Sequence, residues 1–426
     1  MTRNHRLTWF LTLTTTAALW LGCREKPSPE DATPAPGPSA SAAPELARAE
    51  VHPKGDAARG EALTQAFECG RCHDGAELVQ SPLEQHCGHC HMDIMNGTFK
   101  APKTELAKWQ PVVEPYRDIP SLQSSAQRFK ASWLASFLTA PHDLRPHLKQ
   151  SMPRLALTEE QATDIAAFLT KGAPAPAQKD PLAGGDLAKG RALMEQKGCP
   201  SCHTMTGVPA FATQPDAKSA DERTRRGVLL APDLRFARER MPRESAIRWI
   251  RDPSSIKKST LMPSTSLSEQ EARDIAAYVF DTPLEAAPKR AVPERLAVLS
   301  RPVRYQEVFD EVFSKTCVHC HGDPQVARGD GGPGNTGGFG FKPRRLNLAS
   351  YSALLSGMVD TEGERVSAFK PTADGTPRLV AALLARQAEE AGAKPGEVRG
   401  MPLSLPALSS EQVQLVESWI AQGRPR

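Results

Sequence analysis

The sequence predicts a mainly α-helical protein in which three similar helical domains follow one another along the chain. Three observations lead to this prediction. A Cys-x-x-Cys-His motif occurs four times, an amphipathic helix stopped by proline recurs, and each predicted domain closes with Met-Pro followed by a helix that has its own capping signal. The chain has 426 residues, too many for one small core, and its 38 prolines indicate linkers between small domains.

Five parts are predicted along the chain. They are an export signal (residues 1–22), a disordered tether (23–55), a first domain (56–172), a middle domain (185–282) and a last domain (302–424). The tether consists mostly of Pro, Ala and Ser with scattered charges, a composition that buries too little apolar surface to fold. Linkers around residues 173–184 and 283–301 separate the three domains.

The N-terminus indicates export and lipid attachment. Arg3 and Arg6 precede an apolar run over residues 7–22, which is short for a membrane span and fits a signal peptide. The run ends in Leu-Gly-Cys23, which resembles the lipobox of bacterial lipoproteins, although Trp20 stands where leucine is usual. We therefore expect Cys23 to be lipidated and the mature protein to be anchored to a membrane in the periplasm. A retained membrane anchor is the alternative.

The remaining cysteines all belong to the repeated motif. The chain has nine cysteines, and the eight besides Cys23 form the units Cys69/Cys72/His73, Cys87/Cys90/His91, Cys199/Cys202/His203 and Cys317/Cys320/His321. Two thiols three residues apart can form thioethers with both vinyl groups of one porphyrin, and the adjacent imidazole can bind its iron. The motifs therefore predict four covalently bound haem c groups, attached through these cysteines, with the four histidines as iron ligands.

The first two motifs also fit a second kind of metal site. Only 14 residues separate Cys72 from Cys87, a spacing that a zinc ribbon can have. Export and the histidine that follows each of the two motifs favour haem over zinc.

The predicted domains repeat more than the cysteine motif. Gly60 stands nine residues before Cys69, and Gly190 stands nine residues before Cys199, each inside a predicted helix. The closing helices begin with the capping boxes Thr158/Gln161, Ser268/Glu271 and Ser409/Gln412. Each then carries an aromatic residue that we expect to face the helix before the motif, namely Phe168, Tyr278 and Trp419.

This order resembles the class I cytochrome c family, in which an N-terminal helix, Cys-x-x-Cys-His, a loop, Met-Pro and a C-terminal helix follow one another. The resemblance implies that Met152, Met262 and Met401 are distal iron ligands. It also makes Met241 a core residue, because Met241 aligns with Phe129. The last domain departs from the pattern.

In place of the helix glycine, the last domain has Phe309 and Phe313, and a glycine-rich loop over residues 322–340 follows its motif. Its motif and its ending resemble cytochrome domains common in planctomycete-type proteins. We expect the loop to wrap the haem edge.

Three methionines leave one of four irons without a second ligand. Two comparisons with the middle domain give different answers. Gly60 and Cys69 have the same spacing as Gly190 and Cys199, which makes His73 the partner of Met152. In contrast, the 31 residues from His91 to Leu122 equal those from His203 to Leu234, which favours His91. We prefer His73, because loop lengths vary more easily than docked helices. The other haem then sits in an 18-residue insertion, and its second ligand is His86, Met92, Met95, His142 or His147, or its site is open. His89 and His319, inside their own motifs, are interpreted as spacers.

Electron transfer is the function that these features favour. A run of His/Met haems suits traffic between a quinol-oxidising complex and an oxidase or another acceptor, so redox proteins are the expected partners. No motif supplies a nucleophile or an acid–base pair, so we do not expect an enzyme. The formal charge of +4 includes the basic residues of the export signal and leaves out the negative haem propionates, so the mature protein is expected to be mildly acidic. The charge therefore gives no reason to expect binding to nucleic acid. The alternatives are a dihaem-peroxidase-like reductase with an open haem in the first domain, or a docked subunit of a respiratory enzyme; the oligomeric state is open.

Overall fold

The structure, a computed structural model, describes residues 55–148, 152–175, 177–219, 221–325 and 333–426. The expected export signal, Cys23 and nearly all of the tether lie outside these residues. The prediction of a mainly helical fold is confirmed. Among the described residues, β1 (Met358–Val359) and β2 (Arg365–Val366) form one short antiparallel pair, and no helix is long and apolar enough to cross a membrane.

The helices occupy three stretches of chain, which we call the first, middle and last segments, with the residue ranges of the three predicted domains. The first segment contains α1 (Ala57–Ala66), η1 (Cys69–Arg71), η2 (Leu83–Gln85), α2 (Cys87–Asn96), α3 (Lys103–Val113), η3 (Glu114–Tyr116), α4 (Ser125–Arg128), α5 (Ala131–Thr139) and α6 (Glu159–Leu169). The middle segment contains α7 (Leu187–Gln196), η4 (Cys199–Ser201), α8 (Glu222–Leu230), η5 (Leu234–Phe236), α9 (Ala237–Arg240), α10 (Arg243–Arg251), η6 (Pro253–Ser255) and α11 (Glu269–Asp281). The last segment contains α12 (Tyr305–Val308), η7 (Phe309–Cys317), α13 (Pro333–Thr336), α14 (Tyr351–Leu355), α15 (Arg378–Glu390) and α16 (Ser410–Ala421).

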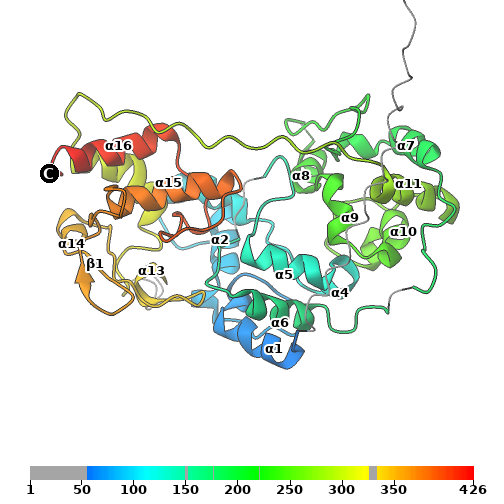
Figure 1. Ribbon diagram of the computed structural model, residues 1–426, viewed down its shortest axis with the longest axis horizontal. Helices are drawn as coiled ribbons and strands as arrows, with labels where there is room; N and C mark the ends of the chain where they lie inside the picture. The colour runs from blue at the N-terminus through cyan, green and yellow to red at the C-terminus, as the bar shows by residue number, and fades with distance from the viewer. Residues whose placement is uncertain (1–54, 149–151, 176, 220, 326–332) are drawn as a thin grey trace, which may run out of the picture. The chain divides into compact units, whose positions relative to one another are not determined.

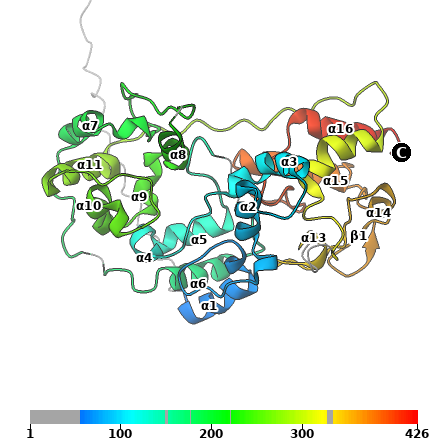
Figure 2. The same cartoon turned by 180° about the vertical axis from the view of Figure 1, so that it is seen from behind.

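A glycine lets the first and last helices of a segment cross closely in two of the three segments. In Figures 1 and 2, α1 lies beside α6, and α7 lies beside α11. A Cβ atom added to Gly60 would stand 2.0 Å from the carbonyl oxygen of Asp164, and one added to Gly190 would stand 2.1 Å from that of Asp274. Only glycine allows the two backbones to approach this closely. The same positions face Phe168 and Tyr278, whose Cβ atoms would lie 2.9 and 2.8 Å from the added atoms, so these two aromatic residues face the first helix as expected.

In the last segment an aromatic contact replaces the glycine crossing. The helix before the motif begins as α12 and continues as η7, a π-helix that runs into Cys317. Phe313 and Trp419 are both fully buried, and their ring centres are 6.4 Å apart with the ring planes nearly perpendicular. Two large rings hold the helices further apart than a glycine would, which explains why this segment needs no glycine there.

The three predicted capping boxes are present. The side-chain oxygens of Thr158, Ser268 and Ser409 each accept the backbone N–H three residues later, and the side-chain oxygen of the Gln or Glu at that position accepts the backbone N–H of the cap residue. α6, α11 and α16 therefore begin where the sequence predicts, because these signals act within a single turn.

Each segment has its own apolar core. One cluster of buried residues contains Phe168 of the first segment, a second contains Tyr278 of the middle segment, and a third contains Trp419 of the last segment. A fourth, smaller cluster of Ile94, Leu106 and Val113 joins α2 to α3. The expected 18-residue insertion is therefore a larger helical hairpin that extends through α3, because α2 alone has too little apolar surface to be stable.

Candidate haem-binding sites

The first and third motifs form the same turn. Just after η1 the backbone N–H of His73 donates to the carbonyl of Cys69 at 2.9 Å, and just after η4 that of His203 donates to the carbonyl of Cys199 at 3.0 Å. Such a turn brings both thiols and the imidazole of one motif to one side of the chain. This is the arrangement that two thioethers and one iron–imidazole bond to a single haem require.

Backbone carbonyls hold the two imidazoles in one orientation. Nδ1 of His73 lies 2.8 Å from the carbonyl oxygen of Pro120, and Nδ1 of His203 lies 2.9 Å from that of Pro232. A carbonyl only accepts hydrogen bonds, so Nδ1 carries the proton and Nε2 keeps the lone pair that binds a metal. Burial lowers the pKa of both histidines, which also favours the neutral imidazole.

This geometry decides between His73 and His91 in the first segment. The N–H of Leu122 donates to the carbonyl of Asp74 at 2.8 Å, as the N–H of Leu234 donates to that of Thr204 at 2.9 Å. His73 therefore occupies the position that corresponds to His203, and its pairing with Met152 stays a prediction. The longer route from His73 to Leu122 passes through the inserted hairpin.

The predicted methionine ligands lie in three different settings. Met152 packs against the same apolar cluster as Cys69, whereas Met262 is half-buried in the loop before α11. The half-buried Met401 donates its N–H to the carbonyl of Ala382 at 2.9 Å. Met241 is 6% exposed inside the core of the middle segment, which agrees with the expected core role. The roles of Met152, Met262 and Met401 as iron ligands stay predictions.

The second motif lies on a regular α-helix instead of a tight turn. The imidazole of His86 caps α2, with Nδ1 accepting the N–H of His89 at 3.0 Å. His91 is buried, and its Nδ1 has no hydrogen-bond partner within the described part of the chain. Burial, followed by the charge of His319, lowers the pKa of His91 to about 4. His91 is thus held neutral, as an iron ligand must be.

The last motif follows the π-helix η7 and meets the glycine-rich loop. Gly334 donates its N–H to the carbonyl of Cys320 at 2.7 Å, and a Cβ atom added to it would stand 2.5 Å from Cε1 of His321. The described part of the loop therefore packs on the motif histidine, while its end reaches the first segment, where the N–H of Phe339 donates to Glu68 at 3.2 Å. Burial lowers the pKa of His321.

Three of the four motifs gather around Tyr116, a residue that sequence patterns gave no reason to select. The Tyr116 hydroxyl donates to the carbonyl of Ser404 at 2.8 Å, which links the inserted hairpin to the last segment. Burial raises the pKa of Tyr116, and the neighbouring thiols of Cys320, Cys72 and Cys87 raise it further. The thiol of Cys87 is also within hydrogen-bonding reach of Cys72 and, with burial, raises the pKa of that thiol.

Buried ion pairing also holds the first and last segments together. Arg154, two residues after Met152, lies 3.3 Å from Glu389 of α15, and both side chains are buried. Arg399, two residues before Met401, donates to the carbonyls of Arg154 and Leu155 at 3.0 and 3.3 Å.

Four cations meet where the first segment contacts the middle one. Burial lowers the pKa of Arg128 and of Arg240 to about 10, and for Arg240 repulsion from Arg128 and Arg145 lowers it further. Burial lowers the pKa of Lys257, and repulsion from Arg128 and Arg145 lowers it further. Within the described ranges, no carboxylate lies at salt-bridge distance from Arg128, Arg240 or Lys257, and Nε of both Arg128 and Arg240 lacks a partner.

The residues present fit haem. Arg128 is buried, and Arg240 and Lys257 are half-buried. Cations withdrawn from water without a carboxylate nearby are costly unless another anion accompanies them, and each haem carries two anionic propionates. Around the first two motifs, which could also be a zinc ribbon, the described residues contain no group of three or more His, Cys, Asp or Glu side chains that could hold a metal ion.

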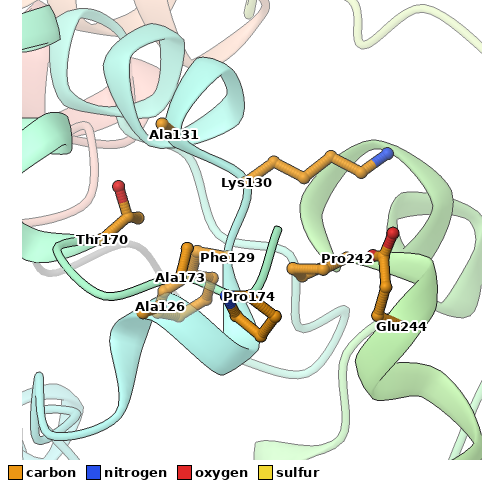
Figure 3. A pocket seen from close by; sticks show the side chains of 9 residues that line it. All are labelled: Ala126, Phe129, Lys130, Ala131, Thr170, Ala173, Pro174, Pro242 and Glu244. Carbon is orange, nitrogen blue, oxygen red and sulfur yellow. The ribbon is translucent and has the colours of Figure 1, made fainter. Parts of the chain in front are cut away.

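One cavity lies away from the motifs. It has a volume of about 270 Å³ and is lined by Ala126, Phe129, Lys130, Ala131, Thr170, Ala173, Pro174, Pro242 and Glu244. Figure 3 shows the Lys130 side chain leaving this cavity towards the middle segment, where its Nζ donates to the carbonyl of Arg238 at 2.7 Å. No motif cysteine or histidine lines it, so it is a gap between packed segments.

A buried carboxylate on two of the three closing helices, α6 and α11, was also missed by the sequence analysis. Asp164 accepts the N–H of Asp56 at 2.7 Å, and Asp274 accepts that of Asp186 at 2.9 Å. Each accepting aspartate precedes the crossing aromatic residue by four positions and ties the start of the first helix to the last. The equal spacing in both repeats was the signal that could have identified them.

Comparison with known proteins agrees with this geometry. The family model named Cytochrome c matches residues 187–282, the stretch that runs from the start of α7 to the end of α11. No curated protein and no solved structure matches the chain significantly. The chain therefore contains a cytochrome c domain at residues 187–282, which supports membership of a c-type cytochrome family and implies covalently bound haem c with a role in electron transfer.

Proposed function

We propose that the chain is a tetrahaem cytochrome c that carries electrons between redox proteins in the bacterial periplasm, anchored to a membrane through a lipid on Cys23. The quinol-oxidising side of a respiratory chain is the proposed source of electrons, and an oxidase or another periplasmic acceptor is their destination. The observation that carries the proposal is the proximity of three motifs: the rings of His91 and His319 lie 6.0 Å apart beside Tyr116, and a Cβ atom added to Gly88 of the second motif would stand 3.3 Å from the carbonyl oxygen of Cys72 of the first.

The thiol contact explains why this gathering suits electron transfer. A thioether joins each motif cysteine to the edge of its porphyrin, so neighbouring thiols of Cys72 and Cys87 bring two haem edges together. Covalent haem, when bound, supplies an iron that alternates between the ferric and ferrous states. The chain's own residues hold the edges close, bury them and fix the neutral imidazoles of His73, His91 and His203.

The buried cations suggest how the middle segment joins the same path. Propionates of the haems at His73 and His203 would neutralise Arg128 and Arg240, which lie between the two motifs. A haem pair that shares one set of cations is held at a constant separation. The proposed path therefore runs from the third motif to the first, then to the second and the fourth, and it differs from the order of the motifs in the sequence.

A haem count tests the proposal. A pyridine haemochrome assay and the intact mass of matured protein are expected to give four haems per chain, because four complete motifs use every cysteine other than Cys23. Three or fewer haems would overturn the proposal, and two haems with one zinc would identify the first two motifs as a ribbon. Carbon monoxide binding to the reduced protein tests the alternative of a peroxidase-like enzyme, which requires an open iron.

A further inference from the structure

The haem at Cys87 and Cys90 requires a second axial ligand, and most candidates are poorly placed. Met95 lies one turn after His91 on α2, so both side chains leave the same face of the helix, whereas two axial ligands must approach the iron from opposite sides. Met92 is on the same helix, and the His86 ring is folded back as the cap of α2.

The candidates after α5 are also unfavourable. His142 is exposed, and its ring packs between Phe137 and Phe236 of the middle segment, with ring centres 5.7 and 6.0 Å away. His147 is exposed in the following loop. Within the described residues, the rings that pack beside His91 are those of Tyr116 and His319, and neither His142 nor His147 is among them.

The last segment supplies a histidine at the required separation. The ring centres of His91 and His319 are 6.0 Å apart, and the ring planes are inclined by 53°. An imidazole nitrogen binds a metal at about 2 Å and its ring centre lies about 1 Å further out, so two imidazoles on opposite sides of one iron have centres about 6 Å apart. The observed separation therefore leaves room for an iron between the rings.

Buried contacts beside the two rings determine how they approach each other. The Tyr116 ring packs on His91 with centres 4.7 Å apart, and its hydroxyl is bound to Ser404 of the last segment. Tyr116 thus touches His91 and is hydrogen-bonded to the last segment, whose motif carries His319.

The histidine at the matching position of the second motif behaves differently. His89 also stands between the two cysteines of its motif, but it lies 3.5 Å from Asp93 on its own helix. The two spacer histidines therefore have the same place in the motif and different surroundings.

We propose that His319 is the second axial ligand of the haem bound by Cys87, Cys90 and His91. The proposal rests on the tetrahaem function proposed above. It revises the interpretation of His319 as a spacer, and it makes the last segment part of a haem site in the first. The resulting bis-imidazole iron lacks a thioether ligand, so this haem has the lowest potential of the four.

The experiment compares His319→Ala with the matched control His89→Ala in full-length matured protein. Haem stoichiometry is measured first, because fewer than four haems in the unsubstituted protein would contradict the proposed function and not the ligand assignment. At four haems per chain, His319→Ala is expected to convert one of four low-spin ferric signals in the EPR spectrum to high spin. Added imidazole is expected to restore the low-spin signal, and His89→Ala should leave the spectrum unchanged.

A second variant covers the case in which alanine disturbs folding. His319→Met keeps a ligand at this position and is expected to raise the lowest of the four potentials while the spectrum stays low-spin. An unchanged spectrum in His319→Ala with an unchanged lowest potential in His319→Met would overturn the proposal. Equal effects of His89→Ala and His319→Ala would also overturn it, since they would indicate general damage to the motifs.

Discussion

The crossing of α7 and α11 allows a stability prediction to be worked from a distance. A Cβ atom on Gly190 would lie 2.1 Å from the carbonyl oxygen of Asp274 and 2.8 Å from Cβ of Tyr278. Because ordinary contacts of this kind begin at 3.4 Å, Gly190→Ala must push the two helices apart by more than an ångström. Overpacking costs roughly 1–3 kcal/mol, and a backbone obstacle lies at the upper end of this range.

Helix propensity partly offsets this cost. Alanine is better than glycine in a helix interior by about 1 kcal/mol. We therefore expect Gly190→Ala to lower the free energy of unfolding of the middle segment by about 2 kcal/mol, which is a roughly thirty-fold change in its unfolding equilibrium constant.

Hydrogen exchange measures this loss locally, which suits a chain with several cores. Amides of α7 and α11 are expected to lose protection by roughly thirty-fold in Gly190→Ala, while those of α16 keep theirs. Gly227→Ala is the control, because its added Cβ would be 3.8 Å from Sγ of Cys202, an ordinary contact. Unchanged protection in Gly190→Ala, or an equal loss in Gly227→Ala, would refute the reasoning.

Three further predictions concern a ligand, an exposed ion pair and a core residue. Met262→Ala should lower the potential of the middle haem and remove its sulfur-to-iron absorption band. Met241→Ala should keep the band and destabilise the middle segment by about 2–5 kcal/mol. The reverse outcome would show that the alignment of Met241 with Phe129 is wrong. A hydrogen bond from Arg243 lowers the pKa of Asp180 below its ordinary 3.8, so the stabilisation is present above about pH 4 and is lost as the pH falls through the lowered value. The free energy of opening of α10, obtained from hydrogen exchange after correction for the intrinsic rate at each pH, should therefore fall below pH 4. The fall should be less than about 1 kcal/mol because the pair is exposed. A free energy of opening that rises as the pH falls would contradict this sign. Trp419→Ala removes a fully buried ring and should cost about 3–5 kcal/mol in thermal unfolding of the last segment; a loss below 1 kcal/mol would show that the core does not depend on it.

Much of the fold was predictable because its signals are local. The capping boxes at Thr158, Ser268 and Ser409 act within one turn, and the structure has all three. The glycine crossings were predictable because an internal repeat shows the same residue at the same spacing. The inserted hairpin was underestimated, since Leu106 and Val113 of α3 reveal their partner Ile94 only once the chain is folded.

Local residue patterns were enough to predict where haem can be attached, because two thiols and an imidazole within five residues suffice for that chemistry. Tertiary structure decided which histidine takes the ordinary position: the carbonyl of Pro120 accepts from His73, and loop lengths allowed either choice. It also brought Tyr116 to Ser404, 288 residues further along the chain, and so His91 to His319. Such contacts depend on how separately folded cores pack against one another, and no short-range pattern in the chain encodes that packing.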